Sequence, residues 1–159
     1  MKRPRQVRPA SKNDLTRLAR KLAELPLFSA YGLDADTLAK RWIEGRVRGD
    51  GMLVGEIDGE LVGLCWFHPT GTFGTGAYLR TLAIASGHQG QGVGAELLAA
   101  FEEATGTATG GRFLLASDFN DGAHRFYQRH GYVEVGRIPS FAWAGITERI
   151  FWKPSAVRR

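Results

Sequence analysis

The chain has 159 residues, 43% of them hydrophobic, which is enough to bury one sizeable core within a single domain. Its one cysteine, Cys65, excludes an internal disulfide and fits a reducing compartment, and the sequence lacks the run of about 20 apolar residues that a membrane helix needs. The net charge is +5, but five basic side chains lie within residues 1–5 and 158–159, and the remaining 16 basic residues balance 16 acidic ones, which does not favour a nucleic-acid-binding body. We expect one cytoplasmic domain over residues 1–159, with loose tails at residues 1–5 and 155–159, no metal and no membrane contact.

The first part of the chain predicts one short strand and two helices. Residues 6–9 read as a strand that is closed by a proline. Residues 14–24 carry leucines at helical spacing and predict a helix, which breaks at residues 25–32. A second helix should begin near residue 34, with Asp34 or Asp36 as its N-terminal cap.

The middle of the chain predicts three strands. Residues 52–57 and 60–68 are joined by Asp58-Gly59, which is a strong hairpin signal. Strict alternation in the second strand places Leu61 on the same face as Cys65. A glycine-rich loop follows at residues 69–76. The next strand, residues 78–84, is apolar apart from Arg80 and Thr81, which indicates burial on both faces.

The rest of the chain predicts a helix after the glycine cluster at residues 86–94, a strand at 112–119, a helix at 122–130 ended by Gly131, and strands at 132–137 and 147–153. The central strand–helix–strand unit should form a right-handed crossover, so that strands 78–84 and 112–119 run parallel. The other strands can pair as antiparallel neighbours. This pattern predicts an α+β fold with a mixed, mostly antiparallel sheet of six to seven strands.

The glycine cluster indicates an anion site. Glycine lets a ligand approach the main chain closely, and the helix that follows offers unpaired N–H groups and the positive end of its dipole. A P-loop is excluded, because Ala95 and Glu96 stand where lysine and a hydroxyl residue belong. A dinucleotide-binding fold is disfavoured, because the loop follows a late strand instead of the first one. A tight turn that binds nothing remains the alternative.

Two motifs in the right order resemble the GCN5-related N-acetyltransferase (GNAT) family. The first is the loop Gln89-x-x-Gly92-x-Gly94, and the second, one strand later, is Asn120-x-x-Ala123-x-x-Phe126-Tyr127-x-x-x-Gly131-Tyr132. The resemblance covers nearly the whole chain. It implies the acyl-CoA acyltransferase fold with helices on both faces of the sheet, acetyl-CoA as cosubstrate, and direct transfer of an acetyl group to an amine in a ternary complex.

The resemblance also implies site residues. The glycine loop would hold the pyrophosphate, a strand end and Asn120 would bind the pantetheine arm, and Tyr127 would be the general acid that protonates the leaving thiolate. From the residues alone, Asn120 is equally a helix cap and Tyr127 a core aromatic. The residues expected at the cofactor are Leu82, Ala83, Ile84, Gln89, Gly90, Gln91, Gly92, Val93, Gly94, Ala95, Asn120 and Tyr127.

The acceptor site is less well defined. The family's substrate-flanking segments correspond to residues 27–33 and 138–145, whose aromatic side chains suggest an acceptor with an apolar part; they are Phe28, Tyr31, Phe141 and Trp143. The acceptor would be a small-molecule or peptide amine. Glu148, Asp118 and His68 are open candidates for a general base, and a water relayed by backbone carbonyls would also serve. Cys65 could carry the acetyl group, although an inert buried thiol is the simpler interpretation.

Other functions stay open. A non-catalytic acyl-CoA sensor would keep the cofactor site without chemistry. The basic tails leave nucleic-acid binding as a weaker option, and the resemblance leaves room for a homodimer.

Overall fold

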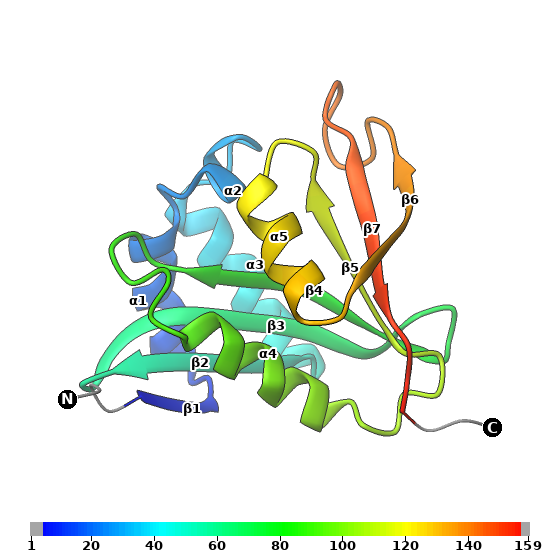
Figure 1. Ribbon diagram of the computed structural model, residues 1–159. Coiled ribbons are helices and arrows are strands. Elements are labelled where there is room, and N and C mark those ends of the chain that lie inside the picture. The colour runs from blue at the N-terminus through cyan, green and yellow to red at the C-terminus, as the bar shows by residue number, and fades with distance from the viewer. Residues whose placement is uncertain (1–4, 157–159) are drawn as a thin grey trace.

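A seven-stranded mixed sheet in the order β1-β2-β3-β4-β5-β7-β6 organises residues 5–156, which are those that the computed structural model describes (Figure 1). Every pairing is antiparallel except that of β4 with β5, which confirms the predicted fold class and the parallel crossover. The strands are β1 (Arg5–Pro9), β2 (Gly51–Ile57), β3 (Glu60–Thr72), β4 (Gly76–Ile84), β5 (Arg112–Ser117), β6 (Val133–Ile138) and β7 (Glu148–Lys153).

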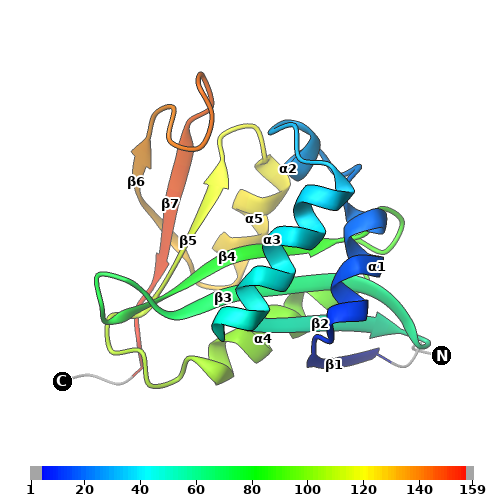
Figure 2. The same cartoon turned by 180° about the vertical axis from the view of Figure 1, so that it is seen from behind.

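Helices cover both faces of the sheet, as Figures 1 and 2 show from opposite sides. The helices are α1 (Lys12–Leu22), α2 (Pro26–Ser29), α3 (Ala35–Arg48), α4 (Val93–Ala104) and α5 (Asp121–Arg129). One hydrophobic core lies under α1 and α3 around Trp42, and a second lies under α4 and α5 around Phe101 and Phe151. Within residues 5–156, no helix has the length and apolar character to span a membrane.

Three sequence expectations are wrong in detail. The break at residues 25–32 contains the short helix α2, which Pro26 starts at its first position. The expected loop at residues 69–76 is mostly strand, because β3 continues to Thr72 and pairs with Gly76 of β4. Leu61 packs with the core on the α1 side instead of joining Cys65, because a bulge opposite Gly55 and Glu56 reverses the side-chain alternation of β3.

The expected N-terminal tail is wrong at Arg5, which belongs to β1. Its guanidinium pairs with Glu96 of α4 at 2.8 Å and donates a hydrogen bond to the carbonyl of Gln91. The first strand is therefore tied to the glycine loop that precedes α4. Residues 1–4 and 157–159 of the expected tails lie outside the described residues.

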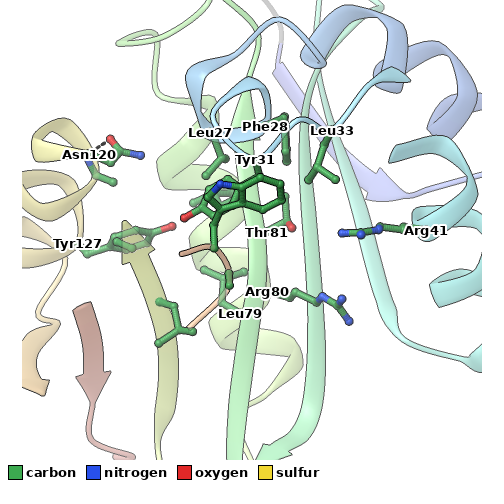
Figure 3. A pocket seen from close by; sticks show the side chains of 16 residues that line it. Leu27, Phe28, Tyr31, Leu33, Arg41, Leu79, Arg80, Thr81, Asn120 and Tyr127 are labelled. Atoms are coloured by element: carbon green, nitrogen blue, oxygen red, sulfur yellow. Dashed lines mark hydrogen bonds between the residues drawn. The ribbon is translucent and has the colours of Figure 1, made fainter. Parts of the chain in front are cut away.

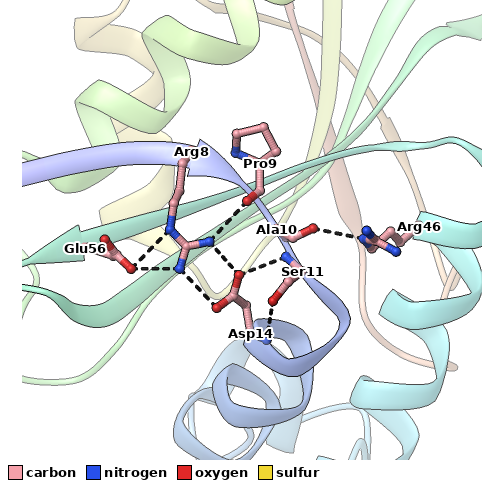
Figure 4. Close-up of polar contacts among 7 residues, drawn as sticks. All are labelled: Arg8, Pro9, Ala10, Ser11, Asp14, Arg46 and Glu56. Carbon is pink, nitrogen blue, oxygen red and sulfur yellow. Dashed lines mark hydrogen bonds and ion pairs between the residues drawn. The ribbon is translucent and has the colours of Figure 1, made fainter.

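A polar cluster joins β1, α1 and β2 (Figure 4). The Arg8 guanidinium donates to the Asp14 carboxylate at 2.6 Å and to the Glu56 carboxylate at 2.8 Å. Asp14 also accepts from the backbone N–H of Ser11, while the Ser11 hydroxyl accepts from the backbone N–H of Asp14 in a capping box. The hydrogen bonds from Arg8 hold the pKa of Asp14, which is 4% exposed, well below its ordinary value of 3.8.

We expect Asp14→Asn to lower the free energy of unfolding by about 2 kcal/mol at neutral pH, because Arg8 loses a nearly buried charged partner. A depressed pKa contributes stability above the ordinary pKa of 3.8 and loses it as the pH falls. The difference between wild type and variant should therefore shrink at about pH 3. Urea unfolding of wild type and variant, at neutral pH and at about pH 3, measures this difference in stability.

Asp36→Asn is the matched control, because it removes an exposed carboxylate from the first turn of α3. It should cost about 0.3 kcal/mol. An Asp14 variant as stable as this control would show that the cluster contributes nothing to folding.

Candidate active site

The site begins where β4 and β5 part. They pair only from Ala77 with Arg112 to Leu79 with Leu114. Beyond that point β5 pairs with β7 alone, so the β5-facing edge of residues 80–84 has no strand partner (Figure 1). The other edge of β4 remains paired with β3. A strand edge with unpaired N–H and C=O groups can bind an extended chain, so this opening suits a long, amide-containing ligand.

The glycine loop lies at the end of the same strand. Gly92 is the N-cap of α4 in a left-handed conformation, with φ 88°, and no side chain caps the helix. The first N–H groups of a helix lack partners within the helix, and the dipole makes this end positive. These features, at the end of β4, suit an anionic group and favour a phosphate.

A cavity of about 460 Å³ connects the loop, the end of β4 and helix α5. Nine of the twelve expected cofactor residues line it: Leu82, Ile84, Gln89, Gly90, Gly92, Gly94, Ala95, Asn120 and Tyr127. Val93 packs in the core instead, and Ala83, which is also buried in the core, borders a separate cavity. Gln91 holds the loop together, because its side chain donates to the carbonyl of Gly87.

Part of this lining was not predicted from the sequence. His88, Phe126, Arg129 and His130 also border the cavity. The last three lie on or just after α5, next to Tyr127, so their positions follow from the helix once it is placed. His88, in contrast, sits inside the glycine cluster and carries no pattern of its own.

Tyr127 lies at the meeting point of this cavity and a second one. Its ring packs on Tyr132 and Phe151 and is 7% exposed, so the core interpretation of this residue holds. Its hydroxyl nevertheless points into the second cavity, whose lining Figure 3 shows. Burial raises the pKa of the Tyr127 phenol above its ordinary value of 10.0, so the group is protonated at neutral pH and can donate a proton or a hydrogen bond.

Asn120 caps α5, as one sequence interpretation predicted. Its side-chain oxygen accepts from the backbone N–H of Ala123 at 3.1 Å. Its amide nitrogen is directed towards the cavity (Figure 3). Capping and ligand contact are therefore compatible in this side chain.

The second cavity, of about 310 Å³, runs from Tyr127 towards α2 and α3. Phe28, Tyr31 and Trp143 line it as expected, while Phe141 lines an adjoining cavity of about 270 Å³. Phe28 also packs edge-on against Trp42 and serves the core. The wall is mostly apolar, but Arg41 of α3 and Arg80 of β4 border both cavities.

A polar cluster closes the adjoining cavity. The Tyr31 hydroxyl contacts both the Ser117 hydroxyl and the Glu148 carboxylate, and Ser117 lies 3.2 Å from Glu148. Burial and then the Glu148 hydrogen bond raise the pKa of Tyr31 to about 12, so Tyr31 acts as a donor to Glu148. Glu148 is 5% exposed and borders this cavity.

The other chemical candidates lie elsewhere. Asp118 is exposed and pairs with Arg149 at 2.6 Å, which lowers the pKa of its carboxyl group. His68 stacks on Tyr78 and lies 3.3 Å from Asp50. Burial raises the pKa of the Cys65 thiol to about 12, so Cys65 is an inert core residue. Among residues 5–156, no group of three or more His, Cys, Asp or Glu side chains is placed to hold a metal ion.

Comparison with known proteins identifies one matching family. Residues 17–132 match the model of the acetyltransferase (GNAT) family. No curated protein sequence is similar enough to count as a match.

Solved structures share the fold at low sequence identity. Ard1 from Thermoplasma volcanium is 19% identical with a TM-score of 0.77, covering 96% of this chain and 99% of its own. An aminoglycoside 6'-N-acetyltransferase complexed with coenzyme A is 18% identical with a TM-score of 0.76, covering 97% and 99%. The yncA protein of Salmonella typhimurium, solved with acetyl-CoA, is 15% identical with a TM-score of 0.72, covering 98% and 96%.

Proposed function

The chain belongs to the acetyltransferase (GNAT) family, whose members use acetyl-CoA, and on this premise we propose that it transfers the acetyl group to an amine acceptor by direct attack in a ternary complex. One observation carries the proposal. The opening between β4 and β5 joins the glycine loop at one end to the Tyr127 hydroxyl and the apolar second cavity at the other. Cofactor and acceptor would therefore meet beside Tyr127.

The described residues fit coenzyme A along its length. The uncapped N-terminus of α4 at Gly92 would bind the pyrophosphate through backbone N–H groups. The free edge of β4 at Leu82 and Ile84 would pair with the amides of the pantetheine arm, with Asn120 contributing its amide nitrogen. Bound in this way, acetyl-CoA supplies a thioester that an amine can attack.

Tyr127 would act as the general acid. The amine nitrogen forms a bond to the acetyl carbon while the carbon–sulfur bond breaks, and the leaving thiolate needs a proton. Tyr127 can donate it, because its raised pKa keeps the phenol protonated. Solvent then restores the phenol proton.

Glu148 is the best placed of the three candidate bases, because of Glu148, Asp118 and His68 it alone borders the cavity of about 270 Å³ that adjoins the second cavity. Its carboxylate would accept the proton that the attacking amine loses, while Tyr31 and Ser117 hold it in place. Cys65 is buried in the core, which favours direct transfer over a covalent acetyl-enzyme.

Activity is tested by mixing the protein with acetyl-CoA and a panel of primary amines while following free thiol with a chromogenic reagent. We expect amine-dependent thiol release, with initial-rate lines that intersect when both substrates are varied. A sample without amine gives the hydrolysis background. Tight acetyl-CoA binding without thiol release for any amine would instead support the sensor function.

Tyr127→Phe should lower kcat about 100-fold, because it removes a proton donor from the leaving thiolate. The dissociation constant for coenzyme A should change less than about twofold, since the ring stays in place. In the wild type, the rate should not decline up to the ordinary phenol pKa of 10.0, because the pKa of Tyr127 lies above it.

Tyr132→Phe is the matched control. Tyr132 is buried beside Tyr127, but its hydroxyl donates to Glu102 at 3.1 Å, away from the site. It should lose stability and keep its kcat. A Tyr127→Phe variant with full kcat would remove Tyr127 from the mechanism.

Gly92→Ala should weaken coenzyme A binding about tenfold, because alanine resists the left-handed conformation that orients the N–H groups of α4. Gly49→Ala imposes the same left-handed backbone strain, since Gly49 has φ 90°, but its Cβ meets nothing within 4 Å, whereas a Cβ at Gly92 would lie 2.6 Å from the Arg5 guanidinium. Calorimetric titration with coenzyme A should show near-wild-type affinity for Gly49→Ala. Equal affinities for the two variants would contradict a phosphate site at Gly92.

A further inference from the structure

Two arginines face the acceptor cavity at the end away from Tyr127. Arg41 comes from α3 and Arg80 from β4, and both border the cavities of about 310 and 270 Å³. Figure 3 shows both guanidinium groups on the side of the cavity opposite Tyr127. Segments far apart in the sequence thus bring two positive charges to one wall of the site.

Neither arginine is paired with a carboxylate in the described part of the chain, since no carboxylate there lies within ion-pair distance of Arg41 or Arg80. The Arg80 guanidinium lies 4.0 Å from the centre of the Trp66 ring, and this cation–π contact positions its planar group. Stacking uses the face of a guanidinium and leaves its N–H edges free to bind an oxyanion.

The third charged group of the cavity of about 270 Å³ is Glu148, which Tyr31 and Ser117 hold. Two cations and one anion leave a positive surplus, so a polycationic acceptor would meet like charges. An acceptor that carries both an amine and an anion matches the pattern, with its amine towards Glu148 and Tyr127 and its anion towards the arginines. The apolar wall at Phe28 and Trp143 suits a hydrophobic body between them.

We propose that the acceptor is an amphipathic amine bearing an anionic oxyacid group, carboxylate or phosphonate, and that Arg41 and Arg80 bind this group. The proposal rests on the proposed function and names the substrate class of the same site. Arginine binds planar carboxylates and phosphate-type groups through paired N–H donors.

Binding tests the proposal without requiring turnover. The probes are N-acetyl-L-phenylalanine, its phosphonate analogue and its carboxamide, each titrated into the protein–coenzyme A complex by calorimetry. We expect the carboxylate or the phosphonate to bind about tenfold more tightly than the neutral amide. Whichever of the carboxylate and the phosphonate binds more tightly identifies the anionic group that the acceptor carries.

Variants assign the effect to the two side chains. Arg41→Gln and Arg80→Gln should each weaken anion binding about tenfold and leave amide binding unchanged. Arg80→Lys, which keeps the charge without the planar fork, should lose part of the affinity. Arg20→Gln is the control, because Arg20 is an exposed arginine on α1 and does not border these cavities.

Failure of this inference is distinct from failure of the proposed function. Amide binding as tight as anion binding, anion binding unaffected by both Gln variants, or no anion binding at all would overturn the inference. In the thiol-release assay, phenylalanine should have a KM about tenfold below that of phenylalaninamide. Equal KM values count against the inference alone, whereas no thiol release from any amine counts against the transferase function.

Discussion

The parting of β4 and β5 is the constraint on which the rest of this structure depends. Two parallel strands that separate after three paired residues leave one edge of β4 without a strand partner, and this edge borders the cavities of the site. The fold stabilises the gap from the other side, because β5 continues its ladder with β7 and Tyr127 packs on Phe151 of that strand. A ligand with amide groups would add hydrogen bonds along this edge, where the Ile84 carbonyl already accepts from the Gln89 side chain at 3.2 Å.

The sequence predicted most of the fold because the relevant signals are local. The Asp58-Gly59 turn, the glycines before α4 and the helix ending at Gly131 each depend on neighbours within a few residues. The crossover between β4 and β5 followed from the handedness of strand–helix–strand units. Six of the nine expected residues that line the first cavity lie within the two motifs, while Leu82 and Ile84 belong to the strand before the glycine loop and Ala95 directly follows that loop.

The features that the sequence did not predict depend on contacts between distant segments. The bulge that redirects Leu61 reflects the register between β2 and β3, and no local pattern marks it. The capping box of Ser11 and Asp14 is an exception, because it is local, yet the sequence interpretation began the helix only at residue 14. Arg80 did carry a signal, as a charge inside an apolar strand, but its partnership with Arg41 emerges only when α3 lies over the sheet.

Arg5 couples the chain's first strand to the glycine loop before α4. Its guanidinium stands 2.6 Å from the place that a Cβ on Gly92 would occupy, and it holds the Gln91 carbonyl and Glu96. The pairing of β1 with the sheet and the conformation of the glycine loop are therefore energetically coupled, because Arg5 contacts both. Ligand binding at the loop should therefore slow amide hydrogen exchange in β1. Exchange in this edge strand would then report whether the loop is occupied.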